Sequence, residues 1–170
     1  ATQNPIEHEG TYRLPEAQLD RFLFKIEVDY PTIEQEIKII GDFHGRKNKI
    51  DWNSIKAVMD AQQIAKYRLQ VNSLHIDEHL IRYIAQIVNQ TRNNSSLFLG
   101  ASPRASLAIL TGAKAIAAIK GRDFVNPDDI KVAALPVLRH RIMLTPEKEM
   151  EGITSREIIK EIIEKIEIPR

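Results

Sequence analysis

Two patterns of apolar and polar residues divide the chain near Pro31. From Phe24 to Tyr30 apolar residues alternate with charged ones, and this period of two predicts a half-buried strand. The preceding residues, Leu14 to Phe22, favour a short helix with Pro15 near its first position. Beyond Pro31 the apolar spacing becomes that of amphipathic helices. The pattern therefore predicts a short strand and helix followed by a mostly helical remainder.

Start and stop signals place the helices individually. Side chains that cap helix N-termini, several with the spacing of a capping box, precede each apolar stripe. The predicted starts are Thr32 with Gln35, Asp51 or Asn53, Asp77, Ser102 with Pro103, Asn126 with Pro127, and Thr154 with Glu157. Gly41 and Gly45 are expected to close the helix that starts at Thr32, Gly121 should end the helix that starts at Ser102, and Pro136 should kink or shorten the helix that contains it. About six helices should pack on one another.

Composition sets limits on function. With 170 residues, 43% of them hydrophobic, the chain can bury a core. A net charge of +1 creates no global field that would attract nucleic acid or a membrane surface. The absence of cysteine excludes disulfides and thiolate metal sites, and no apolar run reaches the roughly 20 residues of a membrane-spanning helix. We therefore expect a cytoplasmic protein with no membrane span.

Five ordered motifs carry a resemblance to a known family. ATQNP opens the chain and is followed by EGTY, LPEAQLDRF, GASPRA and LRHRI. In this order they resemble the second half of a MoxR-family AAA+ ATPase. The resemblance implies a mostly α fold, in which residues 1–31 are a strand-helix-strand remnant of the α/β nucleotide-binding core. Residues 32–170 would then be the helical lid domain.

The resemblance assigns roles to three residues. Asn4 matches sensor 1, whose amide holds the attacking water near the terminal phosphate, and Arg21 matches the arginine finger that reaches a neighbouring subunit's nucleotide. Arg104 matches sensor 2. For Arg104 the local sequence supports this role independently. An arginine just after the N-cap Ser102 lies at the positive end of the helix dipole, which is unfavourable and therefore suggests an anionic partner.

The phosphate-binding loop is missing from these residues. No GxxxxGK[ST] motif and no apolar run ending in Asp-Glu occurs, so we expect the chain alone neither to bind ATP tightly nor to hydrolyse it. For the intact protein, the resemblance implies that ATP and Mg²⁺ are the cofactors and that the subunits form a homo-oligomeric ring, expected to be a hexamer. The partners of the intact protein would be neighbouring subunits and client proteins, among them proteins with von Willebrand factor A domains.

Alternative interpretations remain open from the sequence. The chain could be a helical interaction module without nucleotide chemistry, or a helix-turn-helix protein that binds nucleic acid through Arg139, His140 and Arg141. Arg21 could simply pair with Asp20, Glu16 or Glu27, and Arg13 is a second candidate for the arginine finger. A zinc site is not favoured, because the predicted N-cap Asp77 separates the only closely spaced histidine pair, His75 and His79.

Overall fold

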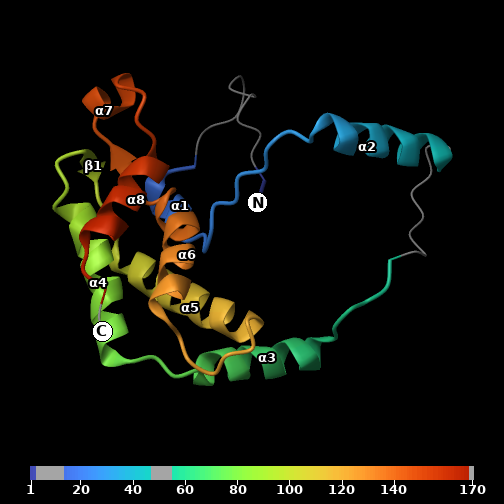
Figure 1. Cartoon of the computed structure of the whole chain (residues 1–170), viewed down its shortest axis with the longest axis horizontal. Coiled ribbons are helices and arrows are strands. Elements are labelled where there is room, and N and C mark those ends of the chain that lie inside the picture. The colour runs from blue at the N-terminus through green and yellow to red at the C-terminus, as the bar shows by residue number, and fades with distance from the viewer. Residues whose placement is uncertain (3–13, 47–54, 169–170) are drawn as a thin grey trace. The chain divides into compact units, whose positions relative to one another are not determined.

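The computed structural model describes residues 1–2, 14–46 and 55–168 (Figure 1). Its contacts group the chain into two compact units. One unit combines Ala1–Lys25 with Val71–Arg170, and the other is Ile26–Gln70. The assignment of residues 1–31 and 32–170 to two domains stays a prediction.

The larger unit is a helical assembly with a small two-stranded sheet (Figure 1). α5 packs against α4 and α6, and α8 packs against α4 and α6. In the sheet β1 and β2 are antiparallel, with Leu97 opposite Leu144, and α5 and α6 lie between them in the sequence. The elements of this unit are α1 (Glu16–Leu19), α4 (Glu78–Arg92), β1 (Leu97–Leu99), α5 (Pro103–Ile119), α6 (Pro127–Leu138), β2 (Met143–Leu144), α7 (Pro146–Met150) and α8 (Ser155–Lys165). The sequence analysis anticipated α1, α4, α5, α6 and α8, but neither the two-stranded sheet nor α7.

The core of this unit follows from the predicted apolar faces. Tyr83 and Ile87 of α4 and Ile109 of α5 are fully buried together with Ile130 of α6 and Ile159 of α8. Alanines line α5 and α6 where these helices meet, and their small side chains allow the two backbones to approach closely. The expectation of a mostly α fold is therefore confirmed.

The predicted N-caps of this unit are present. The side chains of Asp77 and Ser102 accept hydrogen bonds from the backbone N–H groups of His79 and Arg104, at 2.8 and 3.2 Å. Asn126 and Thr154 open α6 and α8 through capping boxes. α6 ends at Leu138, two residues after Pro136. Because a cap depends only on residues within one turn, its position can be predicted locally.

The smaller unit contains α2 (Ile33–Gly45), and α3 (Ala61–Ser73) begins in it. α2 has the predicted capping box of Thr32 and Gln35 and ends at Gly45, so Gly41 does not close it as expected. The helix expected to open at Asp51 or Asn53, with Ile55, Val58, Met59 and Gln62 on one face, begins later than predicted: residues 55–60 are not helical, 51–54 lie outside the described residues, and of the four only Gln62 is in a helix. Helix α3 begins at Ala61 instead. The reason is a reciprocal pair of hydrogen bonds between Asp60 and Gln63, at 2.7 and 2.9 Å, which starts a helix there.

The strand predicted from Phe24 to Tyr30 is also wrong. This segment has no regular secondary structure and belongs to no sheet, and the side chains of Ile26, Val28 and Tyr30 are exposed. A strand needs a partner to satisfy its backbone groups, and none lies beside these residues in the described structure. Phe24 alone turns inward and packs against the core.

A glycine and a buried carboxylate fix the turn between α5 and α6. Gly121 has a φ of 72° and ends α5, where the N–H groups of Gly121 and Arg122 donate to Ala118 and Ala117. Arg122 then forms a two-pronged ion pair with the fully buried Asp129, at 2.6 and 2.8 Å. Burial acts to raise the pKa of Asp129, but the hydrogen bonds from Arg122 and Asn126 outweigh it and lower this pKa.

No helix in the described ranges is long and apolar enough to cross a membrane.

Candidate functional site

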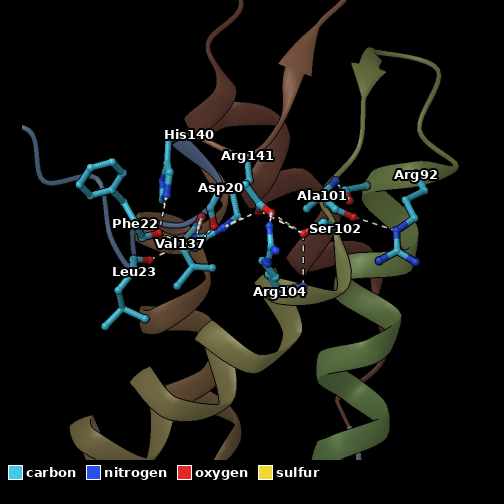
Figure 2. A network of polar contacts seen from close by, with 11 residues as sticks. Asp20, Phe22, Leu23, Arg92, Ala101, Ser102, Arg104, Val137, His140 and Arg141 are labelled. Atoms are coloured by element: carbon cyan, nitrogen blue, oxygen red, sulfur yellow. Dashed lines mark hydrogen bonds and ion pairs between the residues drawn. The ribbon is translucent and has the colours of Figure 1, made fainter. Parts of the chain in front are cut away.

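Arg141 fastens the segment after α1 to the end of α6 (Figure 2). Its guanidinium donates to the backbone carbonyls of Val137 and Leu23, at 2.5 and 3.1 Å, and to those of Asp20 and Phe22. The Nε–H donates to the Asp20 carboxylate at 3.1 Å. All five N–H groups of this arginine are thus engaged, and only 3% of its side chain is exposed.

α1 is shorter than predicted. A helix was expected over Leu14 to Phe22, yet α1 covers only Glu16–Leu19, and Pro15 is its N-cap residue. The N–H groups of Arg21 and Phe22 donate to the carbonyls three residues earlier, those of Gln18 and Leu19, which is a tighter turn than that of an α-helix. Arg141 then binds the carbonyls of Asp20, Phe22 and Leu23. The chain therefore turns after Leu19.

The Asp20 carboxylate joins three side chains. Its Oδ1 accepts from Arg141, and its Oδ2 accepts from the Nη1 of Arg104 at 3.2 Å. The Ser102 hydroxyl lies 2.9 and 3.0 Å from the two oxygens. Burial acts to raise the pKa of Asp20, but the hydrogen bonds from Ser102 and Arg104, and the charge and hydrogen bond of Arg141, hold it below its ordinary value. Asp20 is therefore ionised at neutral pH.

A pocket of about 390 Å³ opens beside this cluster, and its wall combines cationic and apolar side chains. It is lined by Asp20, Arg21, Leu23, Arg104, Leu107, Ala108 and Arg141. The pocket thus brings together Arg21 and Arg104, which are 83 positions apart in the sequence and which the sequence analysis assigned separately to nucleotide chemistry. Three arginines against one carboxylate give this wall an excess of positive charge, which favours an anionic ligand.

Arg21 and Arg104 are held differently from Arg141. Arg104 is the second residue of α5, its side chain is 55% exposed, and within the described part of the chain that side chain makes a single hydrogen bond, to Asp20. Arg21 is exposed at the pocket, while Asp20, the carboxylate considered as its partner, is shared by Arg104 and Arg141. Both arginines can therefore offer N–H donors to a ligand, whereas Arg141 cannot.

The loop before α5 is fixed against α4. Ala101 donates its N–H to the hydroxyl of Thr91 at 2.9 Å, and Arg92 donates its Nε–H to the carbonyl of Ala101 at 2.8 Å (Figure 2). A Cβ atom at Gly100 would lie only 2.6–2.8 Å from backbone atoms of Thr91 and Arg92. Glycine is thus required here so that the GASPR segment can approach α4 and place Ser102 and Arg104.

Replacing Gly100 by alanine should lower the free energy of unfolding by about 1–3 kcal/mol, because the clash is with backbone atoms that cannot rotate away. Urea unfolding followed by circular dichroism measures this change. Gly41→Ala is the matched control, since Gly41 lies inside α2 with open space around it and should be neutral or slightly stabilising. Equal stability of the Gly100→Ala variant and the unmodified protein would show that the approach to α4 is not tight.

The basic run from Arg139 to Arg141 faces inward rather than toward solvent. Arg141 is buried, and the Nε2 of His140 lies 3.0 Å from the carbonyl oxygen of Phe22. Burial, with a smaller opposing effect of that carbonyl, lowers the pKa of His140. Arg141 therefore cannot bind a nucleic-acid phosphate, because its N–H groups already donate to Asp20 and to backbone carbonyls. This argues against the interpretation of the run as a nucleic-acid surface.

The sequence analysis missed the two residues that organise the site. Asp20 was considered only as a partner of Arg21, and Arg141 only as a member of a basic run. Their motifs, LDRF and LRHRI, were the only signal. Asn4, the predicted sensor 1, lies outside the described residues, so its role stays a prediction. Among the described residues no group of three or more His, Asp and Glu side chains is placed to hold a metal ion.

Comparisons with known proteins agree with the motifs. The family profile of the AAA lid domain matches residues 89–162, and that of the ATPase family associated with various cellular activities (AAA) matches residues 1–24. A Bacillus subtilis protein, bearing the name uncharacterized protein YeaC, is 40% identical over 99% of this chain and 52% of its own length. Chaperone MoxR1 of Mycobacterium tuberculosis is 36% identical over 100% of this chain and 46% of its own length.

A solved structure shares the fold. It belongs to a provisionally assigned ATPase from Cytophaga hutchinsonii, is 37% identical, and superposes with a TM-score of 0.88 over 100% of this chain and 53% of its own. The chain thus spans about half the length of the relatives it matches. On these similarities and its ordered motifs, the chain belongs to the MoxR family of AAA+ ATPases.

Proposed function

We propose that this chain supplies the nucleotide-sensing arginines and the lid of an ATPase that remodels or matures partner proteins. The observation that carries the proposal is the pocket where Arg21 and Arg104 meet. It is positively charged, and Arg104 offers unused donors beside the N-terminus of α5, an arrangement suited to phosphate. ATP with Mg²⁺ would supply the phosphoryl group that is transferred to water.

In this proposal Arg21 acts as the arginine finger and Arg104 as sensor 2. A guanidinium near the terminal phosphate stabilises the charge that develops during phosphoryl transfer. Because both arginines line one pocket of one chain, they would act on the same phosphate group. If Arg21 reaches the nucleotide of a neighbouring subunit, Arg104 therefore does so as well. Asn4 would orient the attacking water as sensor 1.

The groups that bind the remaining phosphates and Mg²⁺ would come from outside these 170 residues. The chain contains no GxxxxGK[ST] motif, and its relatives are about twice as long. The intact protein would form a homo-oligomeric ring, taken as a hexamer, in the cytoplasm. The name of the mycobacterial relative, a chaperone, supports protein clients, and we extend this to clients with von Willebrand factor A domains.

Substituting Arg104 by alanine tests the proposal. In the intact gene product that contains these residues, we expect ATP binding to weaken about 10- to 150-fold, because a charge-assisted hydrogen bond contributes about 1.5–3 kcal/mol. Titration with a fluorescent ATP analogue and Mg²⁺ measures the dissociation constant. The isolated 170-residue chain should release no phosphate from ATP above background in the same buffer.

Arg156 provides the matched control. It is an exposed arginine at the second position of α8, as Arg104 is at the second position of α5, but it does not line the pocket. Arg156→Ala should leave ATP binding unchanged. Equal ATP affinity of the Arg104→Ala variant and the unmodified protein would contradict the assignment of sensor 2.

A further inference from the structure

The carboxylate of Asp20 occupies the position relative to Arg104 that an anionic ligand would take (Figure 2). An arginine in the first turn of a helix is unfavourable without a nearby negative charge. Here Asp20 provides that charge, with Oδ2 located 3.2 Å from the Nη1 of Arg104 and 2.9 Å from the Ser102 hydroxyl. The N-terminal end of α5 therefore already has an internal anion.

We propose that Asp20 is a positioning residue that competes with the terminal phosphate of ATP for Arg104. Without nucleotide, Asp20 holds Arg104 at the pocket. When phosphate enters, Arg104 exchanges the carboxylate for the phosphate oxygens, and when phosphate leaves, Arg104 returns to Asp20. This inference rests on the proposed function, since it takes Arg104 to be a phosphate ligand.

The two ion pairs of Asp20 differ in a way that permits this exchange. The pair with Arg141 is fixed, because that guanidinium is 3% exposed and uses all its donors. The pair with Arg104 consists of one contact of a side chain that is 55% exposed. Exposed single-contact pairs of this kind are weak and easily replaced by solvent or ions.

Asp20 also remains paired after Arg104 has left. Its Oδ1 still accepts from Arg141, and the Ser102 hydroxyl still lies within hydrogen-bonding distance of both oxygens. Departure of Arg104 therefore leaves no unpaired buried charge, which would otherwise oppose the exchange.

The test compares Asp20→Asn, Arg104→Ala and the double variant in the intact gene product. The amide oxygen of asparagine can still accept from Arg141, but the charge that holds Arg104 is lost. We expect Asp20→Asn to tighten binding of a fluorescent ATP analogue with Mg²⁺ by about 3- to 10-fold, because the carboxylate that competes for Arg104 is lost. In the Arg104→Ala background the same substitution should change the affinity much less.

The outcomes separate the inference from the proposed function. If Arg104→Ala weakens binding but Asp20→Asn does not tighten it, the inference is wrong and the proposed function stands. An equal effect of Asp20→Asn in both backgrounds would likewise show that Asp20 does not act through Arg104. If Arg104→Ala leaves binding unchanged, both fail.

A structure determination of the unmodified protein covers the case in which Asp20→Asn does not fold. The protein is examined with and without a non-hydrolysable ATP analogue. Arg104 is expected within hydrogen-bonding distance of phosphate and away from Asp20 when the analogue is bound, and on Asp20 when it is absent. Arg104 still paired with Asp20 in the presence of the bound analogue would overturn the inference.

Discussion

Substituting Arg21 by alanine is expected to lower the ATPase rate of the intact gene product about 10³-fold or more. The guanidinium would neutralise charge that develops on the phosphoryl group in the transition state, and arginines in this role contribute roughly 10³ to 10⁵ in rate. Arg21 is exposed at the pocket, so its loss should not disturb the core. Phosphate release under saturating ATP measures the rate, and thermal melting verifies the fold.

Two further variants make the interpretation specific. Arg21→Lys retains the charge but loses the planar set of donors, so we expect it to recover only a small part of the rate. Arg156→Ala, at a residue that does not line the pocket, should retain the full rate. A rate within about twofold of the unmodified protein for Arg21→Ala would exclude Arg21 as the finger, at the resolution of such assays.

Substituting Arg141 by alanine should lower the free energy of unfolding by about 3–5 kcal/mol. Without Arg141 the Asp20 carboxylate keeps only the exposed Arg104 and the Ser102 hydroxyl as partners, and four backbone carbonyls also lose a donor. Urea unfolding of the 170-residue chain measures the loss. Arg141→Lys should recover only part of it, because an ammonium has three donors rather than five.

The loss should depend on pH. The pKa of Asp20 in the folded protein is held below its unfolded value of about 3.9. Its ion pairs therefore stabilise the fold fully above that pH, and this contribution is lost as the pH falls through the lower folded pKa. The difference between Arg141→Ala and the unmodified protein should thus be largest near neutral pH and shrink in strong acid.

A surface arginine serves as control for Arg141. Arg82 pairs with Glu78 at 3.6 Å in α4, and both side chains are at least 70% exposed. Arg82→Ala should therefore change the free energy of unfolding by less than about 0.5 kcal/mol. A similarly small effect of Arg141→Ala would mean that the segment carrying Arg21 does not depend on this contact.

The sequence predicted most of the helices because their signals are local. Thr154 and Glu157 satisfy each other's backbone groups within a single turn, so three residues of spacing suffice to place the start of α8. The same chemistry explains the error before α3. Asp60 and Gln63 also have this spacing, and nothing in the sequence ranks them above Asp51 or Asn53.

What could not be predicted depends on residues far apart in the chain. Whether Phe24 to Tyr30 becomes a strand is decided by a partner strand rather than by its own alternation. The bond between Asp20 and Arg141 joins positions separated by 121 residues. The motifs predicted Arg21 and Arg104 as site residues, but only the fold places them at one pocket with Asp20 between Arg104 and Arg141.

Four of the five hydrogen bonds of Arg141 end on main-chain oxygens rather than on side chains. Main-chain carbonyls are common to all residues, so the side chains of Phe22 and Leu23 can vary without loss of these bonds. Both are partly exposed, at 39% and 45%. The position of Arg21 is consequently tolerant of substitution at the two residues that follow it, while remaining sensitive to a residue 120 positions away.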